Sequence, residues 1–545
     1  MIRRRIALLM LLALMASACD RSTDTKPQTV APAGTNVGGT ITVATGPLSS
    51  LDPQLAVDPS SQLLIRTMCD QLIEFDPKTG KAVGGLAESW TVTSKGSRLI
   101  VKLRKGARFS DGEEVTSEDV VFSLSRLASE ELGSPAARIV ERISGFGFVH
   151  GDVQTDRDSL LTSLVGVQRI DSRSLEITLD QPYAEFYKAL SHPVTTPISQ
   201  KAQASNDRFA CAGPYLAPKP IVPGEQIILE RNESYSGGGN HTFSGQGYAD
   251  RFVFVPKDSR AAEFDSFNAA ADIDVAFVPD ARLGEVASSP MRVEAPTGQL
   301  EMIGLPTSVT PFDDPKVRKA LSVILDRDAI AIKVYMGGRS PATSFVGLSD
   351  KPACEFTDHK PDVDAARSLL SDAGVDLAGR PLKLYFNDEF TNRALVEEVA
   401  SQWRAALGLD VQTVALGWDA FISQGLGTKG FDGAFRFSWG PEYPSPERVL
   451  FPLFDTDSIG RDNLSRYSAR DFRESLRRAR KEIDDGRRGG AYFSTERIVC
   501  EEMPAIPIVF DLRTYVVKGR IRSANGELMD RSWAEPNLRD WYISQ

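Results

Sequence analysis

Residues 382–416, LKLYFNDEFTNRALVEEVASQWRAALGLDVQTVAL, carry the clearest fold signal in the chain. Both ends of this stretch, Leu382–Phe386 and Leu409–Leu416, are rich in apolar and β-branched residues and are typical of strands. The apolar residues between them recur at helical spacing, at Val396, Val399, Trp403 and Leu407. Gly408 then ends the helical pattern. Two strands joined by a helix predict a parallel strand pair, so at least this part of the chain is α/β.

Similar signals occur on both sides of this unit. Strand patterns are predicted at Gly39–Ala44, Arg98–Leu103 and Ser174–Leu179. Helix starts are predicted where Thr116 precedes Asp119 by three residues, as in a capping box, and where Asp314 precedes a proline. Alternating strands and helices of this kind predict an α/β protein throughout. The Gly-rich stretch 236–247 lacks the Gly-Lys-Ser/Thr end of a phosphate loop, so a surface loop is expected there.

The composition limits the function classes. A chain of 545 residues predicts three or four domains, and 41% apolar residues are enough for large cores. The net charge of −10 comes without long runs of one sign, which argues against nucleic acid as a partner. Only four histidines occur, far apart in sequence, so no metal site is expected.

The N-terminus predicts export. Three arginines precede the apolar run Ile6–Ala16, which is too short to cross a bilayer, and small residues precede Cys19. The sequence Ala16-Ser-Ala-Cys19 resembles a bacterial lipobox, whose cysteine is acylated, for example with palmitate, and becomes the new N-terminus. We therefore expect a signal peptide over residues 1–18 and a lipidated Cys19 with a flexible tether over 19–37. Ordinary secretion with an incidental Cys19 is the alternative.

The remaining cysteines are Cys69, Cys211, Cys354 and Cys500. An oxidising compartment allows disulfides among them, with three possible pairings that the sequence leaves open. No G-x-S-x-G or H-E-x-x-H motif occurs, and the cysteines and histidines are too few and too separated to nominate a nucleophile with its base. We therefore expect no catalytic residues, no cofactor and no enzyme activity; a hydrolase with a triad dispersed through the chain is the alternative.

Two segments carry a family resemblance, residues 86–90, LAESW, and residues 101–120, VKLRKGARFSDGEEVTSEDV. They resemble the signature of extracellular solute-binding proteins of family 5, the peptide-binding components of ABC importers. Further matching segments follow in order at 211–215, 231–235, 311–321, 326–327, 335–338, 366–370, 439–446 and 504–507. The signature residues themselves are turn and cap residues such as Gly106, Gly112 and Thr116, for which we expect a structural role.

The resemblance implies a periplasmic-binding-protein-like fold, with two α/β lobes joined by two hinge strands and an additional domain on the first lobe. Ligand would close the cleft by hinge motion. Hinges are expected near 300–305 and 508–512. The implied ranges are 38–70, 171–300 and 512–545 for lobe I, 71–170 for the additional domain and 301–511 for lobe II.

The resemblance also nominates ligand-binding residues. Glu442 stands where peptide-binding members have an aspartate that holds the ligand's ammonium group; a rim or structural ion pair is the alternative. Trp439 matches a cleft tryptophan and Arg436 an arginine near the ligand's carboxylate end, with core packing and an internal ion pair as the respective alternatives. Tyr443 is a further candidate. In the loop after the first strand, Thr45, Gly46 and Leu48 would offer backbone groups to an extended ligand.

Together these features predict a monomeric lipoprotein that captures a short peptide and delivers it to the permease subunits of an ABC importer. It would be anchored to the cytoplasmic membrane on the outer side, and be periplasmic if the host has an outer membrane; Asp20 resembles the signal that keeps lipoproteins on the inner one. The alternatives are the same transport role for a nickel chelate, haem, glutathione or an oligosaccharide, and an anchored chaperone or sensor.

Overall fold

The computed structural model describes residues 38–543, apart from the ranges 153–162, 205–208, 220–221, 223, 236–246, 270–271, 348–352, 355–359 and 378–380. The expected signal peptide, Cys19 and the tether lie outside the described residues, as does the Gly-rich stretch up to residue 246. No helix in the described part of the chain is long and apolar enough to cross a membrane.

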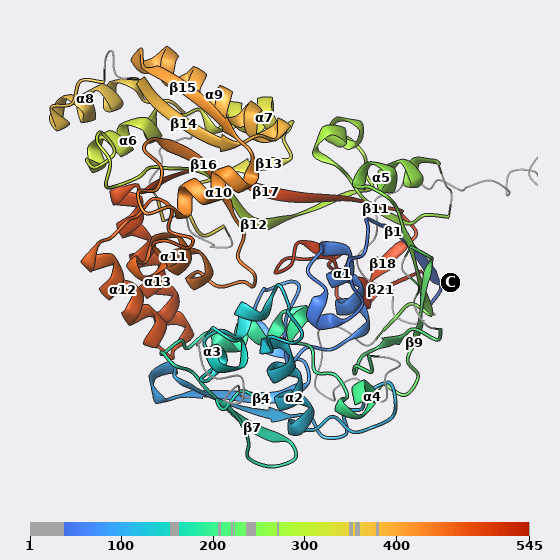
Figure 1. Ribbon diagram of the computed structural model, residues 1–545. Helices are drawn as coiled ribbons and strands as arrows, with labels where there is room; N and C mark the ends of the chain where they lie inside the picture. The colour runs from blue at the N-terminus through green and yellow to red at the C-terminus, as the bar shows by residue number, and fades with distance from the viewer. Residues whose placement is uncertain are drawn as a thin grey trace, which may run out of the picture.

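One long mixed sheet connects the two halves of the protein (Figure 1). Its strands follow the order β15 (Asp410–Leu416), β14 (Pro381–Asn387), β16 (Ala434–Trp439), β12 (Arg292–Gly304), β17 (Ala505–Val517), β11 (Val275–Phe277), β1 (Thr40–Thr45), β10 (Arg251–Pro256), β9 (Ile227–Arg231) and β8 (Tyr215–Leu216), with β13 (Arg339–Pro341) paired to β17. Among the strands of the described residues, only β12 and β17 run from one half to the other, and they pair antiparallel with a register shift between Pro296 and Leu300. The predicted hinge segments 300–305 and 508–512 lie within or directly after these two strands.

The β-α-β unit predicted from residues 382–416 is confirmed. β14 and β15 pair in parallel through all seven residues, and α9 (Phe390–Leu407) connects them. Gly408 closes the helix with φ of 67°, a left-handed conformation that glycine adopts without strain. Val396, Val399 and Trp403 of this helix are fully buried against the sheet. The α/β class is therefore confirmed.

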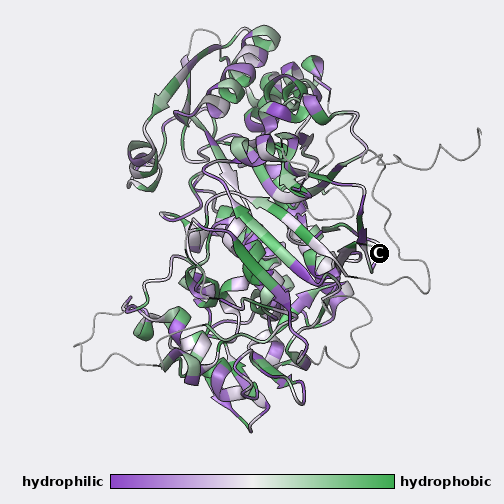
Figure 2. Cartoon of the chain, turned by 90° about the vertical axis from the view of Figure 1, so that its right-hand side faces the viewer, coloured by the Kyte–Doolittle hydropathy of each residue, from purple (hydrophilic) through white to green (hydrophobic). Residues whose placement is uncertain are grey.

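Helices cover the sheet at both ends (Figure 1). In the half formed by residues 301–511, which we call lobe II, they are α6 (Pro315–Val323), α7 (Arg327–Tyr335), α8 (Val363–Ala373), α9, α10 (Trp418–Leu426), α11 (Glu447–Phe454), α12 (Arg470–Lys481) and α13 (Asp485–Glu502). In the other half lie α1 (Pro59–Met68), α4 (Gln200–Ala204) and α5 (Arg260–Ala269), together with the short strand pairs β18 (Ile521–Ser523) with β21 (Trp541–Ile543) and β19 (Met529–Asp530) with β20 (Glu535–Pro536). Figure 2 shows long hydrophobic stretches on strands near the middle of the molecule.

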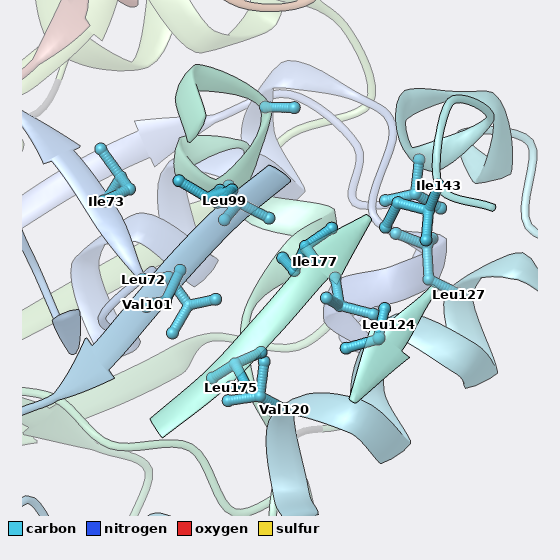
Figure 3. Close-up of a cluster of buried hydrophobic side chains, with 14 of the residues drawn as sticks. Leu72, Ile73, Leu99, Val101, Val120, Leu124, Leu127, Ile143, Leu175 and Ile177 are labelled. Carbon is cyan, nitrogen blue, oxygen red and sulfur yellow. The ribbon is translucent and has the colours of Figure 1, made fainter. Parts of the chain in front are cut away.

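A second, four-stranded sheet lies in a segment that we call the small-sheet region, residues 71–195. Its order is β4 (Ala87–Thr93), β5 (Arg98–Leu103), β7 (Ser174–Thr178) and β6 (Val167–Arg169). The segment also contains β2 (Ile73–Phe75), β3 (Ala82–Gly84), α2 (Ser117–Ala128) and α3 (Phe146–Val149). Leu99 and Val101 of β5, Leu175 and Ile177 of β7 and the apolar face of α2 form one core (Figure 3). Because β7 pairs with β5 and β6, this sheet extends beyond the expected domain boundary at residue 170.

The family signature has structural roles in this region. Thr116 and Asp119 form the predicted capping box at the start of α2. Gly106 and Gly112 have positive φ in the turns around β5. Arg104 donates to the buried Asp70 at 2.9 Å, and Arg539 donates to the same carboxylate at 3.0 Å, so the signature arginine helps to join the small-sheet region to the C-terminal segment. Two disulfides, Cys69–Cys211 and Cys354–Cys500, select one of the three possible pairings.

Candidate functional site

The predicted ligand residues of lobe II lie at the end of β16 and in the loop that leads to α11. Trp439 is the last residue of the strand, and Glu442 and Tyr443 belong to the loop. The segment is held in place by Arg448, on the first turn of α11, whose backbone oxygen accepts a hydrogen bond from Trp439 Nε1 at 2.7 Å. Trp439 is half-buried and lies 6.3 Å from the Phe437 ring, centroid to centroid. One face of the indole therefore packs on the protein while part of the side chain stays accessible.

Glu442 is engaged by an arginine. Arg448 donates from Nε and Nη2 to the two carboxylate oxygens at 2.9 and 2.8 Å, a bidentate pair that leaves the glutamate side chain 35% exposed. Burial raises the pKa of Glu442, but the Arg448 guanidinium outweighs it and holds the pKa below its usual value. The carboxylate is thus charged and partly open to the solvent side, with its charge balanced by Arg448.

Arg436 is committed to an internal partner. Its guanidinium donates to both oxygens of Glu301 on β12, with 2.8 Å from Nε and 2.7 Å from Nη2, and Arg339 donates to the same carboxylate at 3.0 Å. Glu301 is 2% exposed, so two arginines offset one buried negative charge beside the hinge strands. Tyr443 is also buried, with the Arg448 guanidinium 5.6 Å from its ring.

The other predicted residues follow β1, on the opposite half of the large sheet. Thr45 is the last residue of the strand, and its carbonyl oxygen accepts from Lys257 N at 2.8 Å. Gly46 is buried, and a Cβ there would lie 3.4 Å from Ser60 Oγ. Leu48 packs against the core of this half. The structure thus places Thr45, Gly46 and Leu48 together, and Arg436, Trp439, Glu442 and Tyr443 together, on opposite halves of the sheet.

Comparisons with known proteins agree with this architecture. The family model of bacterial extracellular solute-binding proteins, family 5, matches residues 81–461, well over half of the chain. The protein belongs to this family. It is 27% identical over 511 residues to the periplasmic oligopeptide-binding protein OppA of Escherichia coli strain K12, covering 88% of each chain, and 26% identical over 482 residues to the probable deoxycholate-binding periplasmic protein YgiS of the same strain, covering 85% of this chain and 86% of that one.

A solved structure with this fold is the unliganded open form of the periplasmic murein tripeptide-binding protein MppA. Its TM-score is 0.81 at 24% identity, with 94% of this chain and 99% of that chain covered. The periplasmic-binding-protein-like architecture is therefore confirmed for this family 5 protein, and the expected family is confirmed as well.

Sequence reasoning missed a group of residues around His192, which interacts electrostatically with Glu442. His192 is close enough to Glu442 for each to shift the pKa of the other; burial lowers the pKa of His192 to about 4, Glu442 raises it and Arg66 lowers it. The His192 ring lies 5.6 Å from the Trp533 ring, edge to face, and the Arg66 guanidinium lies 5.0 Å from the same indole. These residues are at positions 66, 192 and 533, so no local sequence motif predicts that they lie together.

Carboxylates accompany this second group. Arg66 pairs with Asp530 at 2.5 Å and with Glu535 at 3.5 Å, and Arg513 on β17 pairs with Glu535 at 2.7 Å. Arg66, its carboxylate partners and the Trp533 indole therefore form one group with His192, and His192 is the member of this group within electrostatic range of Glu442. Such an arrangement suits a ligand that carries both charges and apolar surface.

One trio of possible metal ligands is present among the described residues, Cys354, Glu496 and Cys500, whose ligand atoms lie within 4.8 Å of one another. Because the two cysteines form a disulfide, they offer no thiolate, and this trio does not fit a metal site.

Proposed function

We propose that the protein captures a short peptide between its two halves and delivers it to the permease of an ABC importer. The observation that carries this is a charged, partly exposed Glu442 on lobe II that lies within electrostatic range of His192, in a family 5 fold. A peptide has an ammonium group and amide groups, and these match the partly exposed Glu442 carboxylate and the backbone after β1. OppA and MppA, which share this fold, are named for oligopeptides and a murein tripeptide.

We infer that closure takes place about β12 and β17, with lobe II at the range expected from the sequence and with the boundary between the additional domain and lobe I shifted past residue 170 to include β7 in the additional domain. Since these two strands join the halves of the large sheet in the described part of the chain, a change in their backbone angles would move lobe II as a body. We also propose that acylated Cys19 and the tether hold a monomeric binding protein at the outer side of the cytoplasmic membrane, close to the permease.

Thermal melting of the purified protein tests the ligand class. Di- to pentapeptides, an oligosaccharide, glutathione, haem and a nickel chelate would be compared, together with deoxycholate, because YgiS is described as a probable deoxycholate binder. A ligand at 100 times its Kd adds about 2.7 kcal/mol to the free energy of unfolding. We expect a rise with a peptide. If no peptide raises the melting temperature while another compound does, the peptide assignment is wrong, and the appearance of hydrolysis products would restore the enzyme hypothesis.

A further inference from the structure

A cavity separate from the residues discussed above lies where lobe II meets the small-sheet region. Its volume is about 350 Å³, within the range of small-molecule sites, and none of the proposed peptide-binding residues lines it. Gln181 and Pro182, just after β7, form one wall, and α12 forms the other. The two walls are also joined by a hydrogen bond from Ala184 N to the Arg480 carbonyl oxygen at 2.8 Å.

The cavity is strongly basic. Four cations of α12 line it, at Arg473, Arg477, Arg480 and Lys481. The carboxylates in the lining, Asp455 and Asp457, both pair with Arg473, at 3.9 and 2.5 Å. Among the described residues, neither Arg477 nor Lys481 has a carboxylate within ion-pair distance. The protein has a net charge of −10, and an excess of positive charge in one cavity favours the binding of an anion there.

Arg480 provides a second, independent observation. It is 7% exposed, yet its Nε and Nη2 have no hydrogen-bond partner among the described residues. The nearest carboxylate, Glu447, is 3.7 Å from Nε and is shared with Arg142, which donates to it at 2.8 Å. The Arg480 guanidinium also lies 5.1 Å from the Phe451 ring. Burial and the nearby Arg142 lower the pKa of Arg480. A buried guanidinium with unused donors costs free energy, and the charge of an anion bound in the cavity would lower this cost.

We propose that this cavity is a second ligand site, which binds a phosphate dianion or a small phosphate ester through Arg477, Arg480 and Lys481. Planar guanidinium groups donate two hydrogen bonds to phosphate oxygens, and an ammonium group adds a point charge. Three cations without carboxylate hydrogen bonds suit a dianion better than a single carboxylate. The cavity has room for an organic group beside the phosphate. This site goes beyond the proposed peptide capture, and it would link the two walls when occupied.

Isothermal titration calorimetry with the full-length protein tests the site, in chloride buffer at constant ionic strength. Inorganic phosphate and glycerol phosphate serve as probes, so that free phosphate and a phosphate ester are compared directly. We expect at least one of them to bind with a Kd of about 1 mM or tighter. The double variant Arg477→Gln with Lys481→Gln should weaken this binding by more than about tenfold, because it removes two of the three cations that would hold the anion.

Arg478→Gln is the matched control. Arg478 is an exposed cation of the same helix that does not line the cavity, so its loss should change the Kd by less than about twofold. Circular dichroism shows whether all variants are folded. Peptide titrations with the same proteins distinguish a loss of phosphate binding from a loss of peptide binding. The proposal would be overturned if neither probe binds, or if the double variant binds the probe as tightly as the wild type does. It would also be overturned if the Arg478 control loses as much affinity as the double variant.

Discussion

At the scale of single residues, the Glu442–Arg448 pair decides what the proposed peptide site can recognise. A carboxylate that already faces a bidentate guanidinium attracts a ligand ammonium less strongly than a free carboxylate would, although its exposed side remains open. Peptide selectivity for a free N-terminus is therefore expected to be moderate.

Glu442→Gln tests this expectation. The glutamine keeps an oxygen for Arg448 but removes the negative charge, so a peptide with a free N-terminus should lose about tenfold in affinity, in line with about 1.4 kcal/mol. The same peptide with an acetylated N-terminus should change by less than about twofold. Calorimetric titrations of both peptides measure the difference. Equal losses for the two peptides would reject an ammonium contact and leave Glu442 as a structural partner of Arg448.

Arg436, Trp439, Glu442 and Tyr443 could be predicted because they lie in one contiguous segment of the sequence. The same contiguity keeps them close together in the structure. Their partners were less accessible to sequence reasoning. Arg436 and Glu301 are 135 positions apart, and nothing local marks the glutamate as its counter-ion. His192 likewise comes near Glu442, and Trp533 near His192, only through the tertiary fold.

At the scale of elements, local chemistry was predictable and long-range pairing was not. The capping box at Thr116, the glycine end of α9 and the β14–β15 pair all follow from residues close in sequence. The pairing of β12 with β17 joins segments about 200 residues apart, and its buried strands lack a distinctive alternation. Similarly, the sequence left the disulfide pairing open because chain spacing does not report distance in the fold.

Glu496 connects two elements and makes that connection sensitive to pH. From α13 its Oε1 accepts from the backbone N–H groups of Phe345 and Val346, at 2.6 and 2.9 Å. Burial raises its pKa to about 7, and the two hydrogen bonds counteract this only in part. The unfolded chain therefore releases the proton at lower pH than the folded protein, and the free energy of unfolding falls as pH rises from about 4.5 to 7.

Replacement of Glu496 by glutamine should remove this pH dependence. The acceptor for the two N–H groups is kept and no charge forms, so the variant should gain stability relative to the wild type as pH rises from 5 to 8, by about 3 kcal/mol at most. Urea unfolding at several pH values measures it. Glu501→Gln, an exposed position of the same helix, is the control and should leave the pH profile unchanged. A constant difference between Glu496→Gln and the wild type at all pH values would contradict the assigned cause.

At the scale of the whole molecule, the two halves touch at a place distant in sequence from the hinge strands. Arg142 of the small-sheet region donates to Glu447 of α11 at 2.8 Å, across 305 positions. Glu447 is fully buried and Arg142 also lies 4.6 Å from the Phe451 ring. Tyr183 donates to Ser445 at 3.0 Å, and Ser445 to Glu185 at 2.7 Å. Lobe II is thus held by two strands on one side and by this polar contact on the other. The position of lobe II depends on both.

Arg142→Met should therefore loosen lobe II. The variant leaves Glu447 buried with Arg480 as its remaining cation, 3.7 Å away, and breaking a buried pair in this way costs about 3–5 kcal/mol. Part of this cost can be avoided if the contact separates and water reaches Glu447. We therefore expect a larger radius of gyration by X-ray scattering for the variant without ligand. Saturation with a peptide should restore the radius of the wild type. Urea unfolding gives the stability loss. Arg138→Met, which breaks exposed ion pairs in the same segment, should cost less than about 1 kcal/mol and leave the radius unchanged. Equal effects of the two variants would mean that the contact does not restrain the lobes, and that β12 and β17 alone set their position.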